Sequence, residues 1–316
     1  MKKTARVAAA QVAPVYLDLK ASVAKACDTI QTAGTEGAEL IVFPETFLPG
    51  YPYFVITHDP TETTPFLSRL RENAVQIPSR TTEQLCKAAR DAGCIVAMGI
   101  NELEGGTLYN SQLLIDETGE ILGVRRKLVP TNHERMVWGR GDGSDLRTFS
   151  SRLGILGALI CYEHANALFR YAVQAQHEAI HIAMWPGGMG GLLDIIDASS
   201  RHYGFEGQSF GVIATSILTD DILKALGNGG SVSKFQSGGG RSMIVDPRGK
   251  ILAEASPHEE TILYADLDFD DIVKAKMVVD SCGHYSRPDV LSLQLDSRKK
   301  SPLKITREPE QNSEGD

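Results

Sequence analysis

Hydrophobic runs of strand length alternate with segments of helical periodicity in the first hundred residues. Strand-like runs lie at 5–13 (ARVAAAQVA), 38–45 (AELIVFPE) and 94–102 (CIVAMGINE). Between them, 17–34 and 81–93 carry apolar residues at helical spacing, and each ends at a glycine. This alternation is typical of α/β proteins, in which helices connect neighbouring strands.

Two predicted β-hairpins interrupt this alternation. One spans 107–127 (TLYNSQLLIDETGEILGVRRK) and the other spans 241–255 (RSMIVDPRGKILAEA), and both turn at an Asp-x-x-Gly sequence. Their similarity suggests two related halves, although Asp and Gly are residues that any such turn selects. A purely parallel sheet would not contain two long hairpins. We therefore expect an α/β fold in which two mixed sheets form a layered sandwich with helices outside.

The second half of the chain repeats the alternation of strands and helices. Helical patterns near 165–176 and 192–206 alternate with strand-like runs that include 179–185 and 210–216. Residues 46–80 are rich in Pro and aromatic residues and are expected to form a long loop, a kind of segment that is usually functional in compact domains.

Composition and length favour a single catalytic domain. No Pro-rich or Ser/Gly-rich spacer divides the 316 residues, so we assign 1–296 to one domain. Residues 297–316 are polar and interrupted by Pro, and we expect them to be a disordered tail.

Charge and cysteine usage exclude several classes of protein. The net charge of −8 argues against a nucleic-acid-binding surface, and the basic clusters VRRKL and SRKK are short and expected to be solvated. No stretch approaches the ~20 apolar residues that span a bilayer, so we expect a cytoplasmic protein with no membrane partner. The odd number of cysteines, without a CxxC pair, fits neither a disulfide framework nor a zinc site and suggests a reducing compartment; they are Cys27, Cys86, Cys94, Cys161 and Cys282.

Three predicted strands end at a charged or nucleophilic residue. Glu45 follows LIVFP, Lys127 follows ILGVRR, and Cys161 follows GILGALI. Each residue alone is ordinarily structural, because a free cysteine is usually buried and a charged strand end is usually solvated. Together they form a plausible catalytic set, since a thiol needs a base to remove its proton and a cation to stabilise the anion that follows.

The segments around these residues resemble the nitrilase superfamily of carbon–nitrogen hydrolases, and most closely its bacterial nitrilase branch. The motifs are VFPETFLPGYPYF, RRKLVPTNHERMVWGRGDGS and LGALICYEHANALFRYAVQAQHEAIHIAMWPG, with DSCGHYSRPDV near the C-terminus. The resemblance extends from about Arg6 to Asp289. It implies an α-β-β-α sandwich that forms homodimers and often larger spirals.

The resemblance also implies roles for individual residues. Glu45 is the general base, Lys127 stabilises charge and donates protons, and Cys161 is the nucleophile of a nitrilase that uses no metal or organic cofactor. A second glutamate, Glu134, holds Lys127 and a small nitrile substrate in place. The chain departs from the branch in one position, because Tyr162 follows the cysteine where Trp is more familiar.

The chemistry expected of this set is hydrolysis of a nitrile to a carboxylic acid and ammonia. The cysteine adds to the nitrile carbon to give a thioimidate, which water converts into a thioester and then into the acid. The backbone N–H of Tyr162 is expected to help bind the anionic intermediates, and it is unaffected by the identity of the side chain.

Other residues near the motifs have weaker claims to function. Tyr53, His133 and Trp185 are candidates for the substrate pocket, with core packing equally compatible for the two aromatic residues. We expect Glu163 to orient Lys127 or a backbone group, and His164 to make supporting hydrogen bonds.

Alternative functions remain open at this point. An amidase or an N-carbamoyl amino-acid hydrolase would use the same triad on another substrate. A non-catalytic scaffold would need none of the three residues. A Cys–His protease would require a histidine such as His133 or His284 to act as the only base.

Overall fold

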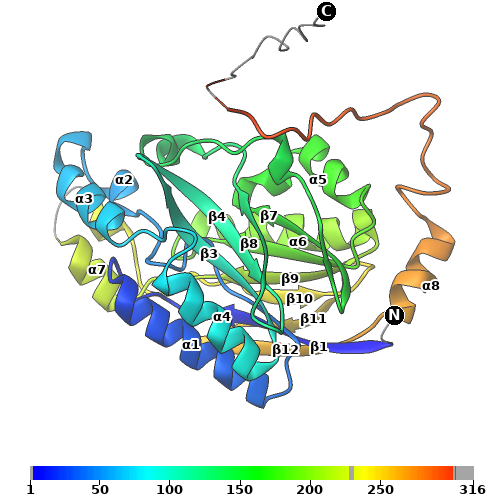
Figure 1. Ribbon diagram of the computed structural model, residues 1–316, viewed down its shortest axis with the longest axis horizontal. Coiled ribbons are helices and arrows are strands. Elements are labelled where there is room, and N and C mark those ends of the chain that lie inside the picture. The colour runs from blue at the N-terminus through cyan, green and yellow to red at the C-terminus, as the bar shows by residue number, and fades with distance from the viewer. Residues whose placement is uncertain (1–2, 228–230, 302, 304–316) are drawn as a thin grey trace, which may run out of the picture.

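The computed structural model describes residues 3–227, 231–301 and 303, and twelve strands and eight α-helices lie within these ranges (Figure 1). The strands are β1 Thr4–Gln11, β2 Leu40–Val42, β3 Ile95–Glu104, β4 Thr107–Ile115, β5 Ile121–Arg126, β6 Phe149–Ser151, β7 Gly154–Ile160, β8 Ile180–Trp185, β9 Phe210–Thr215, β10 Met243–Val245, β11 Ile251–Glu254 and β12 Thr261–Asp268. The helices are α1 Leu19–Thr35, α2 Phe54–Thr57, α3 Thr64–Glu72, α4 Arg80–Ala92, α5 Ala167–Gln174, α6 Leu193–Gly207, α7 Asp220–Leu226 and α8 Asp270–Val278.

The strands form two six-stranded mixed sheets of equivalent topology. One has the order β12-β1-β2-β3-β4-β5 and the other has the order β11-β10-β9-β8-β7-β6. In each sheet three consecutive parallel strands are followed by an antiparallel hairpin, and one further antiparallel strand closes the opposite edge. The expected sandwich of mixed sheets is confirmed, and its two halves share one strand pattern.

The two predicted hairpins are present and turn in the same way. Gly119 and Gly249 adopt φ of +85° and +76° at the turns, a conformation that glycine reaches without a steric penalty. In each turn an aspartate side chain, Asp116 or Asp246, accepts hydrogen bonds from backbone N–H groups two and four residues further along the chain.

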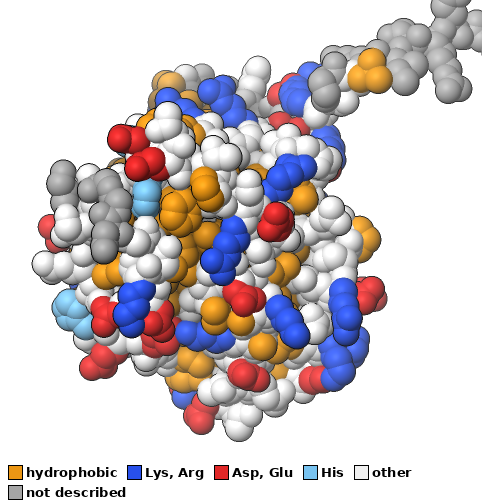
Figure 2. All heavy atoms as spheres, turned by 90° about the vertical axis from the view of Figure 1, so that its left-hand side faces the viewer, with side chains coloured by type: hydrophobic (Ala, Val, Ile, Leu, Met, Phe, Trp, Pro, Cys, Tyr) orange, Lys and Arg blue, Asp and Glu red, His pale blue; other side chains and the backbone are white. Residues whose placement is uncertain are grey.

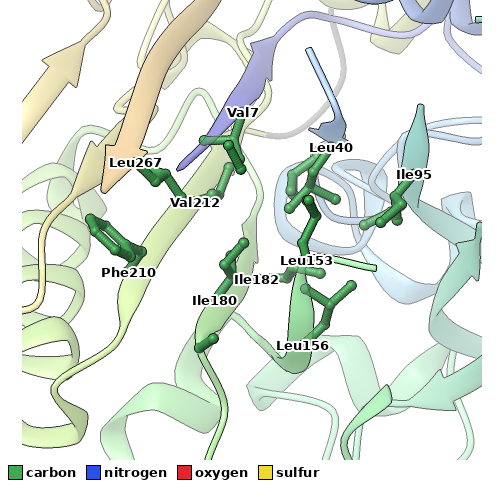
Figure 3. Close-up of a cluster of buried hydrophobic side chains, with 14 of the residues drawn as sticks. Val7, Leu40, Ile95, Leu153, Leu156, Ile180, Ile182, Phe210, Val212 and Leu267 are labelled. Atoms are coloured by element: carbon green, nitrogen blue, oxygen red, sulfur yellow. The ribbon is translucent and has the colours of Figure 1, made fainter. Parts of the chain in front are cut away.

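The main core lies between the two sheets, where alternate residues of each strand point inward (Figure 3). Val7, Leu40 and Ile95 of the first sheet face Leu156 and Ile182 of the second, and all five are fully buried. The outer faces are covered by helices, α1 and α4 on the first sheet and α5 and α6 on the second (Figure 1). The molecule therefore has four layers, α-β-β-α, as the resemblance implied.

The segment 46–80 differs from its predicted form. It was expected to be a loop, but it contains α2, α3 and a short 3-10 helix at Pro60–Glu62. The prediction was wrong because this segment buries its own apolar side chains, among them Phe54 and Leu70, in a separate cluster beside the sandwich. Burial of such a face stabilises short helices that have little periodicity of their own.

The surface carries charges of both signs. On the face shown in Figure 2, Lys and Arg side chains are interspersed with Asp and Glu, and no single-sign area dominates that face. In the described ranges, no helix is long and apolar enough to cross a membrane. Of the predicted tail, 297–301 contain no helix or strand, and most of the remainder lies outside the described residues.

Candidate active site

Glu45 lies in the turn that follows β2, and its carboxylate is completely enclosed by protein. Its Oε1 accepts hydrogen bonds from Lys127 Nζ at 2.9 Å and from Asn110 Nδ2 at 2.6 Å. Its Oε2 is buried and has no hydrogen-bond partner in the described residues. The carboxylate is thus held firmly through one oxygen, while the other is available to take a proton.

Lys127 lies at the end of β5, and its ammonium group bridges two carboxylates. Besides Glu45, Nζ donates to Glu134 Oε2 at 2.8 Å, and both side chains of that second pair are almost fully buried. Glu134 belongs to the 3-10 helix Asn132–Met136 and is held by Tyr51 Oη at 2.9 Å and by the N–H of Thr131 at 2.6 Å. Sequence reasoning missed Tyr51 and Asn110, whose contacts depend on strand pairing and on the fold of the 46–80 segment.

Cys161 lies at the first position after β7, facing these groups from the second sheet. Its φ of +52° is in the left-handed region, which is uncommon for a residue with a side chain. Cys161 Sγ and one carboxylate oxygen each of Glu45 and Glu134 lie within 4.8 Å of one another. The structure therefore brings together the three residues predicted at strand ends, together with the second glutamate.

Burial sets the protonation states of the resting site. Desolvation raises the pKa of Cys161 well above its ordinary value, and the charge of Glu45 adds to this effect, so the thiol is neutral at rest. Burial also raises the pKa of Glu45 to about 7, although Lys127 acts in the opposite direction. Burial lowers the pKa of Lys127, but neighbouring negative charges, Glu45 first, outweigh it and keep the ammonium charged. The arrangement is a neutral thiol beside a carboxylate that titrates near neutral pH.

A second buried ion pair supports the two strand ends that carry Lys127 and Cys161. The Glu163 carboxylate lies 2.7 Å from Arg125 Nη2 and accepts backbone N–H groups from Leu128 and Ile160, at 2.8 and 2.7 Å. Glu163 thus orients backbone groups beside both Lys127 and Cys161, as expected. The expectation that the VRRKL cluster is solvated was wrong, because Arg125 is fully buried between the sheets.

A cavity of about 270 Å³ opens onto Cys161. Its lining includes the apolar residues Ile56, Met189 and Leu192, and Asn132 and His133 supply polar groups. A second hollow of about 280 Å³ shares Ile56 and His133 with the first. The site can hold a small molecule whose apolar body lies beyond the sulfur atom.

The three residues predicted to form the pocket occupy different places. His133 lines the cavity, as does Tyr162. Tyr53 is buried and donates from its hydroxyl to the carbonyl of Gly187 at 3.0 Å, and Trp185 is fully buried against Tyr162 and His164. Neither Tyr53 nor Trp185 is among the residues that line the cavity.

A Cys–His protease requires a histidine base at the Cys161 sulfur. His133 lines the cavity that opens onto Cys161, whereas a carboxylate oxygen of Glu45 lies within 4.8 Å of the Cys161 sulfur. His164 directs its Nδ1 at the carbonyl of Cys161 and its Nε2 at His181, so both of its ring nitrogens are engaged away from the sulfur. His284 is exposed in the C-terminal segment.

The two carboxylates and the thiol could in principle coordinate a small cation. Lys127 Nζ already lies at hydrogen-bond distance from both carboxylates and supplies positive charge at that position. The donor set therefore fits an ammonium-centred site better than a metal centre.

Comparison with known proteins identifies the family of the chain. The model of the family described as carbon-nitrogen hydrolase matches residues 6–277. The chain belongs to the carbon–nitrogen hydrolase family. Among carbon–nitrogen hydrolases, it is 40% identical to a nitrilase of Pseudomonas syringae pv. syringae over 304 residues, covering 93% of this chain and 90% of that protein. It is 39% identical to an arylacetone-specific nitrilase of Alcaligenes faecalis, covering 96% of this chain and 87% of that protein.

The fold is shared with more distant carbon–nitrogen hydrolases. The crystal structure of a carbon–nitrogen hydrolase from Helicobacter pylori superposes with a TM-score of 0.73 at 18% sequence identity, covering 90% of this chain and 96% of that chain. This similarity bears on the fold alone and agrees with the four-layer sandwich described above.

Proposed function

We propose that the protein is a nitrilase that hydrolyses small organic nitriles to carboxylic acids and ammonia. The observation that carries the proposal is the buried cluster in which one ammonium group bridges two carboxylates beside a cysteine thiol. The substrate follows from the relatives, because the proteins that match almost the whole chain at about 40% identity are named nitrilases.

The first half of the reaction uses Glu45 as base and Cys161 as nucleophile. Glu45 accepts the thiol proton while Sγ bonds to the nitrile carbon, and the proton then passes to the nitrile nitrogen to give a thioimidate. Lys127 and the N–H of Tyr162 stabilise the negative charge that develops, and loss of one such donor commonly lowers the rate by about 10²–10³-fold. Glu134 keeps Lys127 in position.

The second half consumes two water molecules. Water, deprotonated by Glu45, adds to the thioimidate carbon to give a tetrahedral intermediate, and loss of ammonia leaves a thioester on Cys161. A second water, again activated by Glu45, releases the carboxylic acid and restores the thiol. Lys127 donates hydrogen bonds to the anion formed in each addition step.

The proposal is tested by measuring ammonia release from a panel of nitriles and from the matching amides. Aliphatic nitriles and arylacetonitriles are both included, because the lining of the cavity includes apolar residues. We expect turnover of at least some nitriles, with the amides slower. Turnover of amides without turnover of any nitrile would identify an amidase instead.

The nucleophile is tested by Cys161→Ala, which should lower nitrile turnover by at least about 10³-fold. Cys94→Ala is the matched control, because Cys94 is an equally buried thiol in another part of the fold. Retention of nitrile turnover by Cys161→Ala would show that the nucleophile is wrongly assigned.

We also propose that the protein forms homodimers or larger homo-oligomers, including spirals, in the cytoplasm. Leu168 of α5 and Phe205 of α6 are 61% and 59% exposed on the same outer layer, which supports an interface there. The free state of all five cysteines supports a reducing compartment. Light scattering of the wild-type chain and of Leu168→Glu with Phe205→Glu tests the oligomer, which the double substitution should weaken.

A further inference from the structure

A second cluster of buried titratable side chains adjoins Cys161 without lining the cavity. It consists of His164 in the 3-10 helix Cys161–Ala165, Glu178 just before β8, His181 within β8, and Tyr203 of α6. Each is at most 2% exposed. None of these four residues takes part in the reaction proposed above, so the cluster requires its own explanation.

The four side chains form one continuous series of hydrogen bonds. His164 Nδ1 lies 2.8 Å from the carbonyl oxygen of Cys161, and His164 Nε2 lies 3.0 Å from His181 Nε2. His181 Nδ1 lies 2.9 Å from Glu178 Oε2, and the Tyr203 hydroxyl donates to Glu178 Oε1 at 2.5 Å. The series begins at the backbone of the nucleophile and ends at a buried carboxylate.

The donors and acceptors in this series fix where the protons lie. A carbonyl oxygen only accepts, so His164 Nδ1 carries a proton and donates. Burial, and then the proximity of His181, hold the pKa of His164 well below its usual range, so this ring is neutral and its Nε2 accepts. His181 Nε2 must therefore donate, and one further proton lies between His181 Nδ1 and Glu178.

The fold makes room for this series at a specific position of the sheet. Gly157 of β7 pairs with His181 of β8, and a Cβ atom at Gly157 would lie only 1.6 Å from Glu178 Oε2. Glycine at this position is what allows the carboxylate to reach the imidazole. Tyr203 also stacks on the His181 ring, with a centroid separation of 3.6 Å.

The end of the series bears directly on the catalytic site through a single peptide group. The carbonyl of Cys161 and the N–H of Tyr162 belong to the same planar unit and point in opposite directions. A hydrogen bond that holds the carbonyl therefore also sets the direction of the N–H. That N–H lies beside the Cys161 sulfur, where it lowers the pKa of the thiol in opposition to the larger effect of burial.

We propose that His164, His181 and Glu178 are positioning residues that orient the N–H of Tyr162 toward the anionic intermediates, acting through the Cys161–Tyr162 peptide group. The inference rests on the proposed nitrilase function. Donation to the carbonyl also polarises the peptide and strengthens its N–H as a donor.

Two substitutions at His164 separate positioning from packing. His164→Phe keeps a ring that can stack on Trp185, as His164 does at 5.3 Å, but it removes the donor to the Cys161 carbonyl. His164→Asn loses the ring but places an amide N–H near the position of Nδ1. We expect His164→Phe to lower kcat about 10- to 100-fold with little change in KM, and His164→Asn to recover most of kcat. An active Phe variant with an impaired Asn variant would show that the ring only packs, and would overturn the proposal.

A second pair of variants tests the rest of the series. In Glu178→Gln the amide N–H can donate to His181 Nδ1 while the amide oxygen accepts from Tyr203, so all hydrogen bonds persist and kcat should stay within about threefold. His181→Phe interrupts the series and should lower kcat as His164→Phe does. A large loss in Glu178→Gln together with a silent His181→Phe would contradict the proton placement.

Two measurements do not depend on nitrile turnover and so distinguish failure of this proposal from failure of the proposed function. Butyraldehyde adds to the Cys161 thiol to give a thiohemiacetal whose oxygen occupies the anion position, whereas iodoacetamide alkylates the thiol without forming an anion there. His164→Phe should weaken butyraldehyde inhibition of iodoacetamide labelling about tenfold or more, measured as an inhibition constant against each variant's own labelling rate. Unchanged aldehyde affinity would overturn the proposal whether or not nitriles are turned over.

The wild-type protein offers a check that no folding defect can obscure. In 15N-histidine spectra, His164 should carry its proton on Nδ1 only, and His181 should be protonated on Nε2. A proton on His164 Nε2, or its absence from His181 Nε2, would overturn the proposed series.

Discussion

The Glu163 carboxylate and the Arg125 guanidinium form a buried ion pair next to the two strand ends that carry Lys127 and Cys161. Arg125 precedes Lys127 by two residues on β5, and Glu163 follows Cys161 by two residues. Arg125 also donates a hydrogen bond from Nη1 to Oε1 of Gln112 in β4, at 3.2 Å. Because its members lie so close to the reacting residues in the chain, the pair couples the stability of the fold to the geometry of the site.

Glu163→Gln should reduce both stability and catalysis. The substitution leaves the Arg125 charge buried without its counter-ion, and breaking such a pair costs about 3–5 kcal/mol in the free energy of unfolding. The loss of backbone orientation at Ile160 and Leu128 should lower kcat by about 10²-fold. Urea unfolding and nitrile kinetics measure the two effects. Lys87→Ala, which breaks an exposed pair with Asp91, is the control and should cost less than about 1 kcal/mol.

The pH dependence of kcat/KM should show an acid limb governed by Glu45. Burial raises the pKa of Glu45 to about 7, and below that pH the carboxyl is protonated and cannot accept the thiol proton. Activity should therefore fall as the pH decreases through 7. A profile that is flat from pH 8 to pH 5 would contradict the assignment of Glu45 as the base.

Glu134→Gln should move this acid limb to lower pH. Burial is the largest cause that raises the pKa of Glu45, and the negative charge of Glu134 raises it further. Neutralising Glu134 therefore stabilises the charged form of Glu45. The Gln oxygen can still accept from Lys127. Glu62→Gln is the control, because it makes the same change of charge at an exposed position and should leave the acid limb in place. A shift of the acid limb to higher pH in Glu134→Gln would show that the charge of Glu134 does not raise the pKa of Glu45.

The strand ends that carry the candidate catalytic residues could be predicted from sequence because each is a short apolar run that stops at a chemically distinctive residue. Glu45, Lys127 and Cys161 can be recognised in this way, since strand ends are where α/β folds commonly assemble their sites. The motifs of the family then assign a role to Glu134. The sandwich of mixed sheets was also predictable, because the two hairpins exclude a purely parallel arrangement.

The partners of the supporting residues could not be predicted, because these contacts depend on which face of a strand is covered. Arg125 and Lys127 alternate with Arg126, a period of two that places both on one face of β5. Only the packing of the second sheet decides that this face is buried. The contact of His164 with His181 likewise depends on the register of β7 with β8, and nothing local in the sequence fixes that register.

Tyr162→Trp should narrow the substrate range without impairing the chemistry. Tyr162 lines the cavity of about 270 Å³, whereas the proposed anion donor is its backbone N–H. A larger ring should lower kcat/KM for phenylacetonitrile about 10- to 100-fold and leave propionitrile nearly unchanged. Tyr162→Phe, which keeps the size of the ring, is the control. An equal loss for both nitriles would mean that the side chain affects the chemistry itself.

Gly99→Ala should displace Glu45 while the sheets remain intact. A Cβ atom at Gly99 of β3 would lie 2.0 Å from the carbonyl oxygen of Pro44 and 2.6 Å from the backbone nitrogen of Thr46. Because both neighbours are backbone atoms, the turn that carries Glu45 must move, and a displacement of about 1 Å can cost 10²-fold in rate.

The measurement for Gly99→Ala is kcat together with the circular dichroism spectrum, which should retain the wild-type shape. Gly106→Ala is the matched control, since a Cβ atom there meets nothing within 4 Å. Full activity in a folded Gly99→Ala protein would show that moving this turn does not change the rate. Glu45 would then not act as a base whose position is fixed by the turn.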